Sequence, residues 1–190
     1  MVTYNVREEP AGSVTLHDTM KTPQAGAGFR RRIYASPLQF LRDLRRIAVS
    51  LRAVLALSSR QGIAAGFRER IMLVVTGVNR CRHCAYGHEF LARRAGISGT
   101  EIAGLLKLDL AQCPESEIPG LVFAIHWAET DGQPTAEATG ALQADYGPAI
   151  ARQIEAAVLL IHVGNRVGNS FDFLLSRASC GRFGLLASER

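Results

Sequence analysis

Two cysteines and a histidine form the part of this 190-residue sequence that is best suited to chemistry. Cys81 and Cys84 are three residues apart, and His88 follows four residues after the second cysteine. In a helix that begins at about residue 82, the three side chains fall on one face. The N-terminus of a helix stabilises a thiolate through its unpaired N–H groups and its partial positive charge. One thiol can then attack a substrate, the other can close a disulfide, and the histidine can accept a proton.

The same residues are compatible with two other roles. Two cysteines and a histidine are credible zinc ligands, and a C-x-x-C motif occurs in zinc sites as well as in redox sites. However, no second cysteine pair and no histidine pair follows at the spacing of a zinc finger. Cysteines also serve as small apolar residues, which is the role we predict for Cys113 and Cys180. The spacing therefore favours a redox centre and leaves a metal site or a structural role open.

Composition favours a globular protein of a reducing compartment. Apolar residues make up 47% of the sequence and charged residues 21%, which is the balance of a folded domain. No apolar run approaches the ~20 residues of a membrane-spanning helix. Residues 1–22 lack the basic start and apolar core of a secretory signal. We therefore expect a cytoplasmic protein with reduced thiols, no membrane contact and no cofactor.

Positive charge is concentrated in the N-terminal third. Residues 1–60 hold 10 Lys or Arg against 4 Asp or Glu, whereas residues 61–190 hold 12 against 13. The excess consists mainly of seven arginines: Arg30, Arg31, Arg32, Arg42, Arg45, Arg46 and Arg52. Such a patch can attract phosphates or an acidic partner, but aromatic residues are not interleaved with it as in nucleic-acid-binding motifs. We interpret it as a basic strap followed by a solvated helix face, and we predict no nucleic-acid partner.

The elements that must position the cysteine motif are predicted to be helices throughout. Residues 1–29 are rich in Gly, Pro, Thr and Ser, so we predict that residues 1–35 form an extended arm. We predict that residues 36–190 form one domain. Apolar periodicity and breakers predict helices at about 37–57, 66–78, 82–95, 98–106, 117–129, 134–146, 149–167 and 170–177. No run of alternating β-branched residues predicts a strand. The expected fold class is all-α, a compact bundle of seven or eight helices.

Two features indicate self-association. The segment 149–167 is apolar nearly all round, so it must be covered on every side. Residues 1–29 have few apolar residues to place in a core and suit an exchange with a neighbouring subunit. We therefore predict a homo-oligomer whose redox helix lies at or near a subunit interface.

The sequence also contains a weak internal repeat. A shift of 86 residues aligns two apolar helical stretches with three identities, so that Glu69, Asn79 and Arg80 match Glu155, Asn165 and Arg166. The second copy has Val167 and Ser170 in place of the two cysteines. The pattern is either the trace of a duplicated helical hairpin or a coincidence.

Several polar and aromatic residues outside the motif have expected roles. His126 and Trp127 are predicted to pack in the core, and core packing is favoured over a substrate pocket for Tyr86 and Phe90. Polar groups on the last long helix need partners. The groups in question are His162, Asn165, Arg166 and Asn169. One candidate role is to brace the active site or a subunit contact, and the other is to form hydrogen bonds at the end of the helix.

Glu69 stands twelve residues before Cys81, and His83 lies between the two cysteines. With C-x-x-C and the histidine four residues later, this pattern resembles the redox branch of the alkylhydroperoxidase D and carboxymuconolactone decarboxylase superfamily. The Ala95–Ser98 segment that ends the helix continues the likeness. The similarity covers about residues 66–107, and residues 154–169 more loosely.

The resemblance implies an alkylhydroperoxidase D-like fold and a thiol-dependent peroxidase. Cys84 would attack the hydroperoxide and Cys81 would resolve the product, with His88 as the base. Glu69 would pass protons through a water, and His83 would assist. A dithiol reductant, lipoyl-bearing in the characterised members, would reopen the disulfide, and the family commonly forms trimers or hexamers.

Two other functions remain alternatives. The first is a non-enzymatic metal-binding or redox-sensing helical module that uses the same thiols. The second is an enzyme similar to carboxymuconolactone decarboxylase, although that branch of the superfamily generally lacks the cysteine pair.

Overall fold

The structure is a computed structural model that describes residues 29–57, 59 and 62–190. These residues form seven α-helices and two short 3₁₀ helices, and they contain no strand. The α-helices are α1 (Pro37–Val49), α2 (Leu51–Ala56), α3 (Ala65–Asn79), α4 (Arg82–Arg94), α5 (Gly99–Leu105), α6 (Ile118–Glu129) and α7 (Ala136–Ala178). The 3₁₀ helices are Glu115–Glu117 and Ala187–Glu189. The all-α class is confirmed, whereas residues 1–28 of the expected arm lie outside the described residues.

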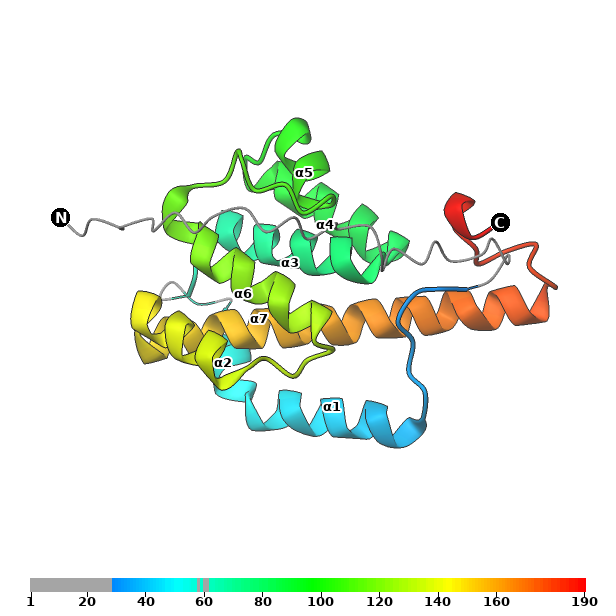
Figure 1. Cartoon of the computed structure of the whole chain (residues 1–190), viewed down its shortest axis with the longest axis horizontal. Coiled ribbons are helices and arrows are strands. Elements are labelled where there is room, and N and C mark those ends of the chain that lie inside the picture. The colour runs from blue at the N-terminus through cyan, green and yellow to red at the C-terminus, as the bar shows by residue number, and fades with distance from the viewer. Residues whose placement is uncertain (1–28, 58, 60–61) are drawn as a thin grey trace, which may run out of the picture.

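Helix α7 is the axis of the bundle. It runs along α3 and α4 on one side and along α1 and α2 on the other, with α6 also packed against it (Figure 1). Ile154, Val158 and Ile161 are among its buried residues. The apolar segment 149–167 is therefore covered largely by the protein's own helices. No helix in the described part of the chain is long and apolar enough to span a membrane.

Two predicted helix boundaries are wrong, and one is confirmed. The helices expected over 149–167 and 170–177 are continuous in α7. The break expected at Gly147–Pro148 is present as a kink, where Gly147 has φ 71° and ψ 162°. Glycine tolerates that backbone conformation, and proline suits the first turn of the helix that follows, so the chain bends there and helical structure resumes at once. The helix expected over 37–57 is instead divided at Ser50 into α1 and α2.

Two side-chain hydrogen bonds between α3 and α7 join residues that the 86-residue shift relates to one another. Thr76 Oγ1 donates a hydrogen bond to Asn165 Oδ1 at 3.2 Å, and Asn79 Nδ2 donates to His162 Nδ1 at 3.2 Å. The shift of 86 residues maps Thr76 onto His162 and Asn79 onto Asn165. Each residue thus contacts the counterpart of its partner, as in an isologous interface. The α3–α4 hairpin itself is not repeated, because α3 ends at Arg80 whereas α7 continues as helix through its counterpart Arg166.

His162 braces this contact as a neutral acceptor. Its side chain is buried, and burial together with nearby Arg166 lowers the pKa of His162 to about 4. The imidazole therefore remains uncharged at neutral pH and can accept the hydrogen bond from Asn79. The polar groups of this part of α7 hold two helices together in the core.

Candidate active site

The cysteine pair is positioned by an abrupt change from α3 to α4. Arg80 takes the left-handed conformation, with φ 57° and ψ 37°, and ends α3. Cys81 is extended and forms the N-cap of α4, where its sulfur accepts the backbone N–H of Cys84 at 3.4 Å. The predicted helix start at about residue 82 is confirmed. Both sulfurs consequently lie at the positive end of α4.

The two thiols form a coupled pair. A hydrogen bond joins Cys81 Sγ and Cys84 Sγ across 2.7 Å; Cys81 is 1% exposed, and Cys84 is half-buried. This hydrogen bond lowers the pKa of Cys81 to about 7 against the effect of burial, with help from the Cys84 backbone N–H and the nearby His83. The proton held between the sulfurs, together with burial, raises the pKa of Cys84 far above its usual range. The pair therefore carries one negative charge near neutral pH.

Behind the thiols, α3 and α4 are joined by a carboxylate–imidazole pair. His88 Nδ1 lies 2.8 Å from Glu69 Oε2, and the Glu69 side chain is almost completely buried. Arg68 Nε donates to the other oxygen of Glu69 at 3.3 Å. Within the described residues, no hydrogen bond joins His88 to either cysteine. A proton passing between this pair and the thiols requires a bridging molecule such as water.

His83 is held by a buried carboxylate of α7. His83 Nε2 lies 2.9 Å from Asp172 Oδ1, and Asp172 also accepts hydrogen bonds from Arg31 at 2.6 Å and from Arg82 at 2.7 Å. Burial would raise the pKa of Asp172, but hydrogen bonds from these three cationic or ionisable side chains lower it below its ordinary value. Asp172 is therefore a fixed negative charge beneath the start of α4.

Arg31 was predicted to belong to a basic strap ahead of the first helix, but its side chain is buried among acidic partners. Its side chain is fully buried, with salt bridges to Asp172 at 2.6 Å and to Glu189 at 3.2 Å. It also donates to Asn169 Oδ1 at 3.3 Å. These partners lie more than one hundred positions away in the sequence, so a local charge pattern could not reveal them. Residue 31 thus ties the chain before α1 to α7 and to the C-terminal segment.

Gly168 of α7 is a site residue that sequence reasoning missed. A Cβ at this position would lie 2.8 Å from Cys81 Sγ and 3.9 Å from Cys84 Sγ. The bare backbone of α7 therefore packs directly against the sulfurs. Its glycine was instead consistent with the helix break expected between residues 167 and 170, so the sequence offered no signal that distinguished a close approach from a helix end.

Three aromatic side chains of α4 and α7 are exposed. Tyr86 is 82% exposed and Phe90 is 58% exposed, so the prediction that they pack in the core is wrong. At about 100° of rotation per residue, both lie on the face of α4 away from Cys84. Phe171 of α7 is also exposed and meets the edge of the His83 ring, with 6.1 Å between the ring centroids.

The other two cysteines lie apart from the pair. Cys113 is half-buried, and burial raises its pKa to about 11; Cys180 is exposed, which differs from the expected small apolar core residue. Within the described ranges, no three His, Cys, Asp or Glu side chains come together in an arrangement that could hold a metal ion.

No family model, curated protein or solved structure matches the chain. The resemblance of the cysteine motif to the alkylhydroperoxidase D superfamily therefore stays a prediction. The geometry of Cys81, Cys84, Glu69, His88 and His83 provides the basis for a functional proposal.

Proposed function

We propose that the protein is a thiol peroxidase of the alkylhydroperoxidase D type, which reduces hydroperoxides through Cys81 and Cys84. The observation that carries this proposal is the coupled thiol pair at the N-terminus of α4. A first deprotonation near neutral pH supplies the thiolate that reacts with peroxides. The half-buried position of Cys84 favours it as the attacking sulfur, since Cys81 is only 1% exposed.

The proposed cycle has three balanced steps. A proton moves from Cys84 to the Cys81 thiolate, and the Cys84 thiolate attacks the distal oxygen of R–OOH. The O–O bond breaks, Cys84 becomes a sulfenic acid, and the leaving alkoxide takes a proton to form R–OH. Cys81 then attacks the Cys84 sulfur and releases water as the disulfide forms. A dithiol reductant is oxidised to its own disulfide as it returns both cysteines to thiols.

The surrounding groups manage protons and charge in this cycle. His88, paired with Glu69, is suited to supply the proton taken by the alkoxide through a bridging water. His83, anchored by Asp172, lies close enough to Cys81 to favour its thiolate. These roles require that Glu69 hold the His88 ring and that Asp172 hold the His83 ring in place.

We also propose that the protein works as a homo-oligomer, a trimer or hexamer by analogy with the superfamily, and that a lipoyl-bearing protein is a suitable reductant. The apolar stripe of α1 and α2 supports self-association because much of it is exposed. Leu38 is 66% exposed, Leu41 58% and Leu55 65%. Another copy of the chain can cover such a surface.

Replacing Cys84 by serine is expected to abolish peroxide consumption, because the attacking sulfur is lost. Cys81→Ser should permit one oxidation and then stop, since the sulfenic acid has no resolving partner.

Glu69→Gln should slow turnover by about tenfold or more, because His88 loses its carboxylate partner. The assay follows hydroperoxide loss in the presence of dihydrolipoamide or another small dithiol.

Cys113→Ser is the matched control and should retain full activity. Activity that survives Cys84→Ser would contradict the proposal. About one zinc ion per chain in the reduced protein, together with no peroxide consumption, would favour the metal-binding alternative.

The rate of thiol oxidation is expected to rise with pH and to reach half its maximum at a pH of about 7. The thiolate of the pair forms as the pH rises through the lowered pKa of Cys81. Stopped-flow measurement of the reaction with hydrogen peroxide, from about pH 5 to about pH 9, checks this. A midpoint near the usual thiol pKa of about 8.5 would show that the pair is not activated.

A further inference from the structure

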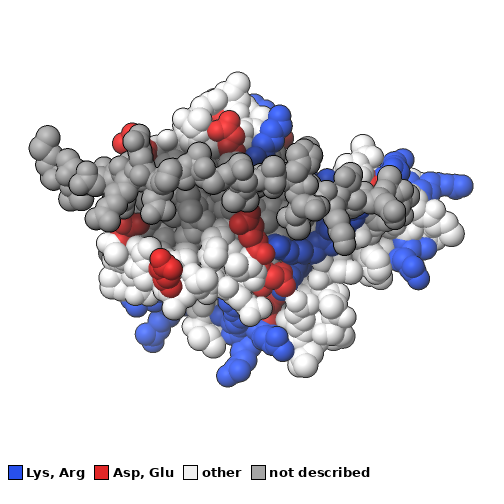
Figure 2. Space-filling model, in the orientation of Figure 1, with Lys and Arg blue, Asp and Glu red and all other residues white. Residues whose placement is uncertain are grey.

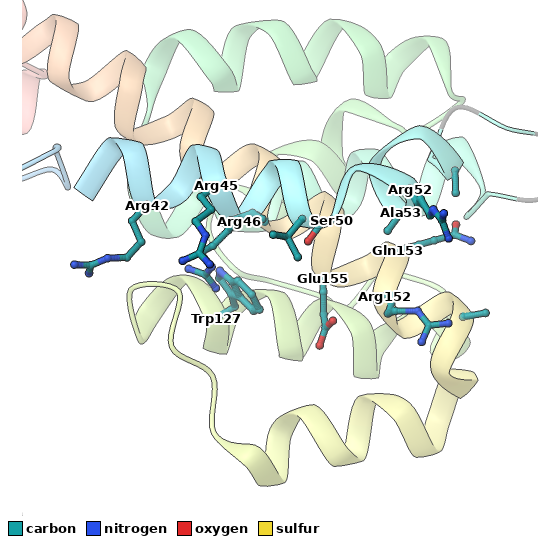
Figure 3. Close-up of a pocket in the computed structure, with 14 residues that line it drawn as sticks. Arg42, Arg45, Arg46, Ser50, Arg52, Ala53, Trp127, Arg152, Gln153 and Glu155 are labelled. Carbon is teal, nitrogen blue, oxygen red and sulfur yellow. The ribbon is translucent and has the colours of Figure 1, made fainter. Parts of the chain in front are cut away.

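A pocket of about 790 Å³ lies between α1–α2 and the helices α6 and α7 (Figure 3). None of the residues proposed to act in the cysteine cycle lines it. Its volume falls within the range of sites that bind small organic molecules. The pocket is therefore a candidate for a binding event separate from peroxide reduction.

The pocket is strongly basic. Five arginines line it together with a single carboxylate, Glu155; the arginines are Arg42, Arg45, Arg46, Arg52 and Arg152. In the part of the chain that the structure describes, the side chains of Arg45, Arg52 and Arg152 form neither a hydrogen bond nor a salt bridge. Figure 2 shows Lys or Arg side chains along the edge of the molecule formed by α1. Uncompensated guanidinium groups around a cavity attract anions and can bind carboxylates or phosphates in a bidentate manner.

Trp127 of α6 and Arg46 of α1 form one wall of the pocket. Trp127 is 6% exposed, and its indole Nε1 is buried and is therefore not open to a ligand in the pocket. The guanidinium of Arg46 lies over the indole ring, 5.1 Å from the centroid, while its Nη2 donates to the Gly132 carbonyl at 3.1 Å. Arg46 is thereby fixed beside Trp127, and the arginines without such contacts are the ones available to an anion.

The remaining lining is apolar and includes Val49, Ala53, Ala56 and Leu159. Glu155 lies on the α7 side of the pocket (Figure 3), in the repeat position that Glu69 occupies on α3. Burial raises the pKa of Glu155, and Arg152 opposes that effect. The pocket thus combines a guanidinium-rich side with an apolar surface and one carboxylate that disfavours anions.

We propose that this pocket binds a small amphipathic organic anion, in which a carboxylate, phosphate or sulfonate is attached to an apolar body. Arg52 and Arg152, which lie at the same end of the pocket (Figure 3), hold the anionic group, and the apolar body covers Val49 and Leu159. A bare inorganic anion lacks this second contact and binds more weakly. The site is independent of the cysteine cycle and does not depend on the proposed peroxidase activity.

The test uses 8-anilinonaphthalene-1-sulfonate as the probe and full-length protein. Trp127 is the single tryptophan of the chain, so its fluorescence is quenched by dye bound beside it. We expect the dye to bind at least about tenfold more tightly than N-phenyl-1-naphthylamine, which has the same rings and no charge. The double variant Arg52→Gln/Arg152→Gln should weaken dye binding about tenfold or more, and Glu155→Gln should strengthen it about threefold.

Arg93→Gln is the matched control, because Arg93 is an exposed arginine of α4 outside the pocket. Its dye affinity should equal that of the unmodified protein. Equal binding of the charged and neutral dyes would overturn the proposal. An equal loss in the Arg93 variant and in the double variant would also overturn it, as would tryptophan fluorescence that the dye does not change.

Discussion

Replacing Gly168 by alanine is expected to slow disulfide formation between Cys81 and Cys84 on the order of a hundredfold. The added Cβ would lie 2.8 Å from Cys81 Sγ, a separation that real side chains do not adopt. Cys81 is 1% exposed, so its sulfur cannot move aside into solvent. Either α7 or the start of α4 must shift, and the alignment of the two sulfurs is lost. The measurement is the rate at which free thiols disappear after addition of one equivalent of hydrogen peroxide.

Gly164→Ala is the matched control for this substitution. Gly164 lies one helical turn earlier on α7, and a Cβ there would have no other group within 4 Å. Alanine in that helix interior should leave the oxidation rate unchanged and increase the free energy of unfolding by about 0.5–1 kcal/mol. Equal oxidation rates in Gly168→Ala and the unmodified protein would mean that the close approach of α7 does not position the thiols.

Asp172→Asn is expected to lower the free energy of unfolding by about 3–5 kcal/mol. The amide keeps the shape of the carboxylate but removes its charge. Arg31, whose side chain is fully buried, then loses its 2.6 Å ionic partner and keeps Glu189 as its remaining carboxylate, beside neutral acceptors on Asn169 and Gly184. A buried guanidinium with incomplete compensation is strongly unfavourable. Denaturant unfolding followed by circular dichroism measures the change.

Glu89→Gln provides the comparison for this charge removal. Glu89 and Arg93 form a surface salt bridge at 2.8 Å between neighbouring turns of α4, and both side chains are well exposed. Loss of such a pair should change the free energy of unfolding by less than about 1 kcal/mol. If Asp172→Asn had an equally small effect, the buried ion pairs of Asp172 would not stabilise the fold.

Much of the helical fold could be predicted from local patterns. Apolar periodicity and the Ser36–Pro37 start placed α1, and the sequence around Gly96 placed the end of α4 within one residue. The Gly147–Pro148 pair likewise predicted the kink in α7. The continuity of α7 through residues 167–170 could not be predicted in this way. Asn169 is buried there and donates a hydrogen bond to the Asn79 carbonyl at 2.8 Å, a tertiary contact that the local pattern does not contain.

The site was predictable where its residues are close in sequence. The spacing of Cys81, Cys84 and His88 indicated a helix start with thiols on one face, and the family resemblance added Glu69 and His83. Asp172 and Gly168 were not predictable, because they reach the cysteine pair only through the packing of α7 on α4. A pattern read along the chain does not contain that tertiary contact.

The packing of Gly168 against Cys81 and Cys84 means that two unlike elements share the thiol site. The turn between α3 and α4 provides the reacting sulfurs at a helix start. Helix α7 runs unbroken past them, with Val167 and Ser170 on either side of the segment that contains Gly168. A continuous helix cannot yield locally as a loop does, so the wall beside the sulfurs is set by the register of α7. A shift of α7 along its axis would replace glycine by a larger side chain at the sulfurs.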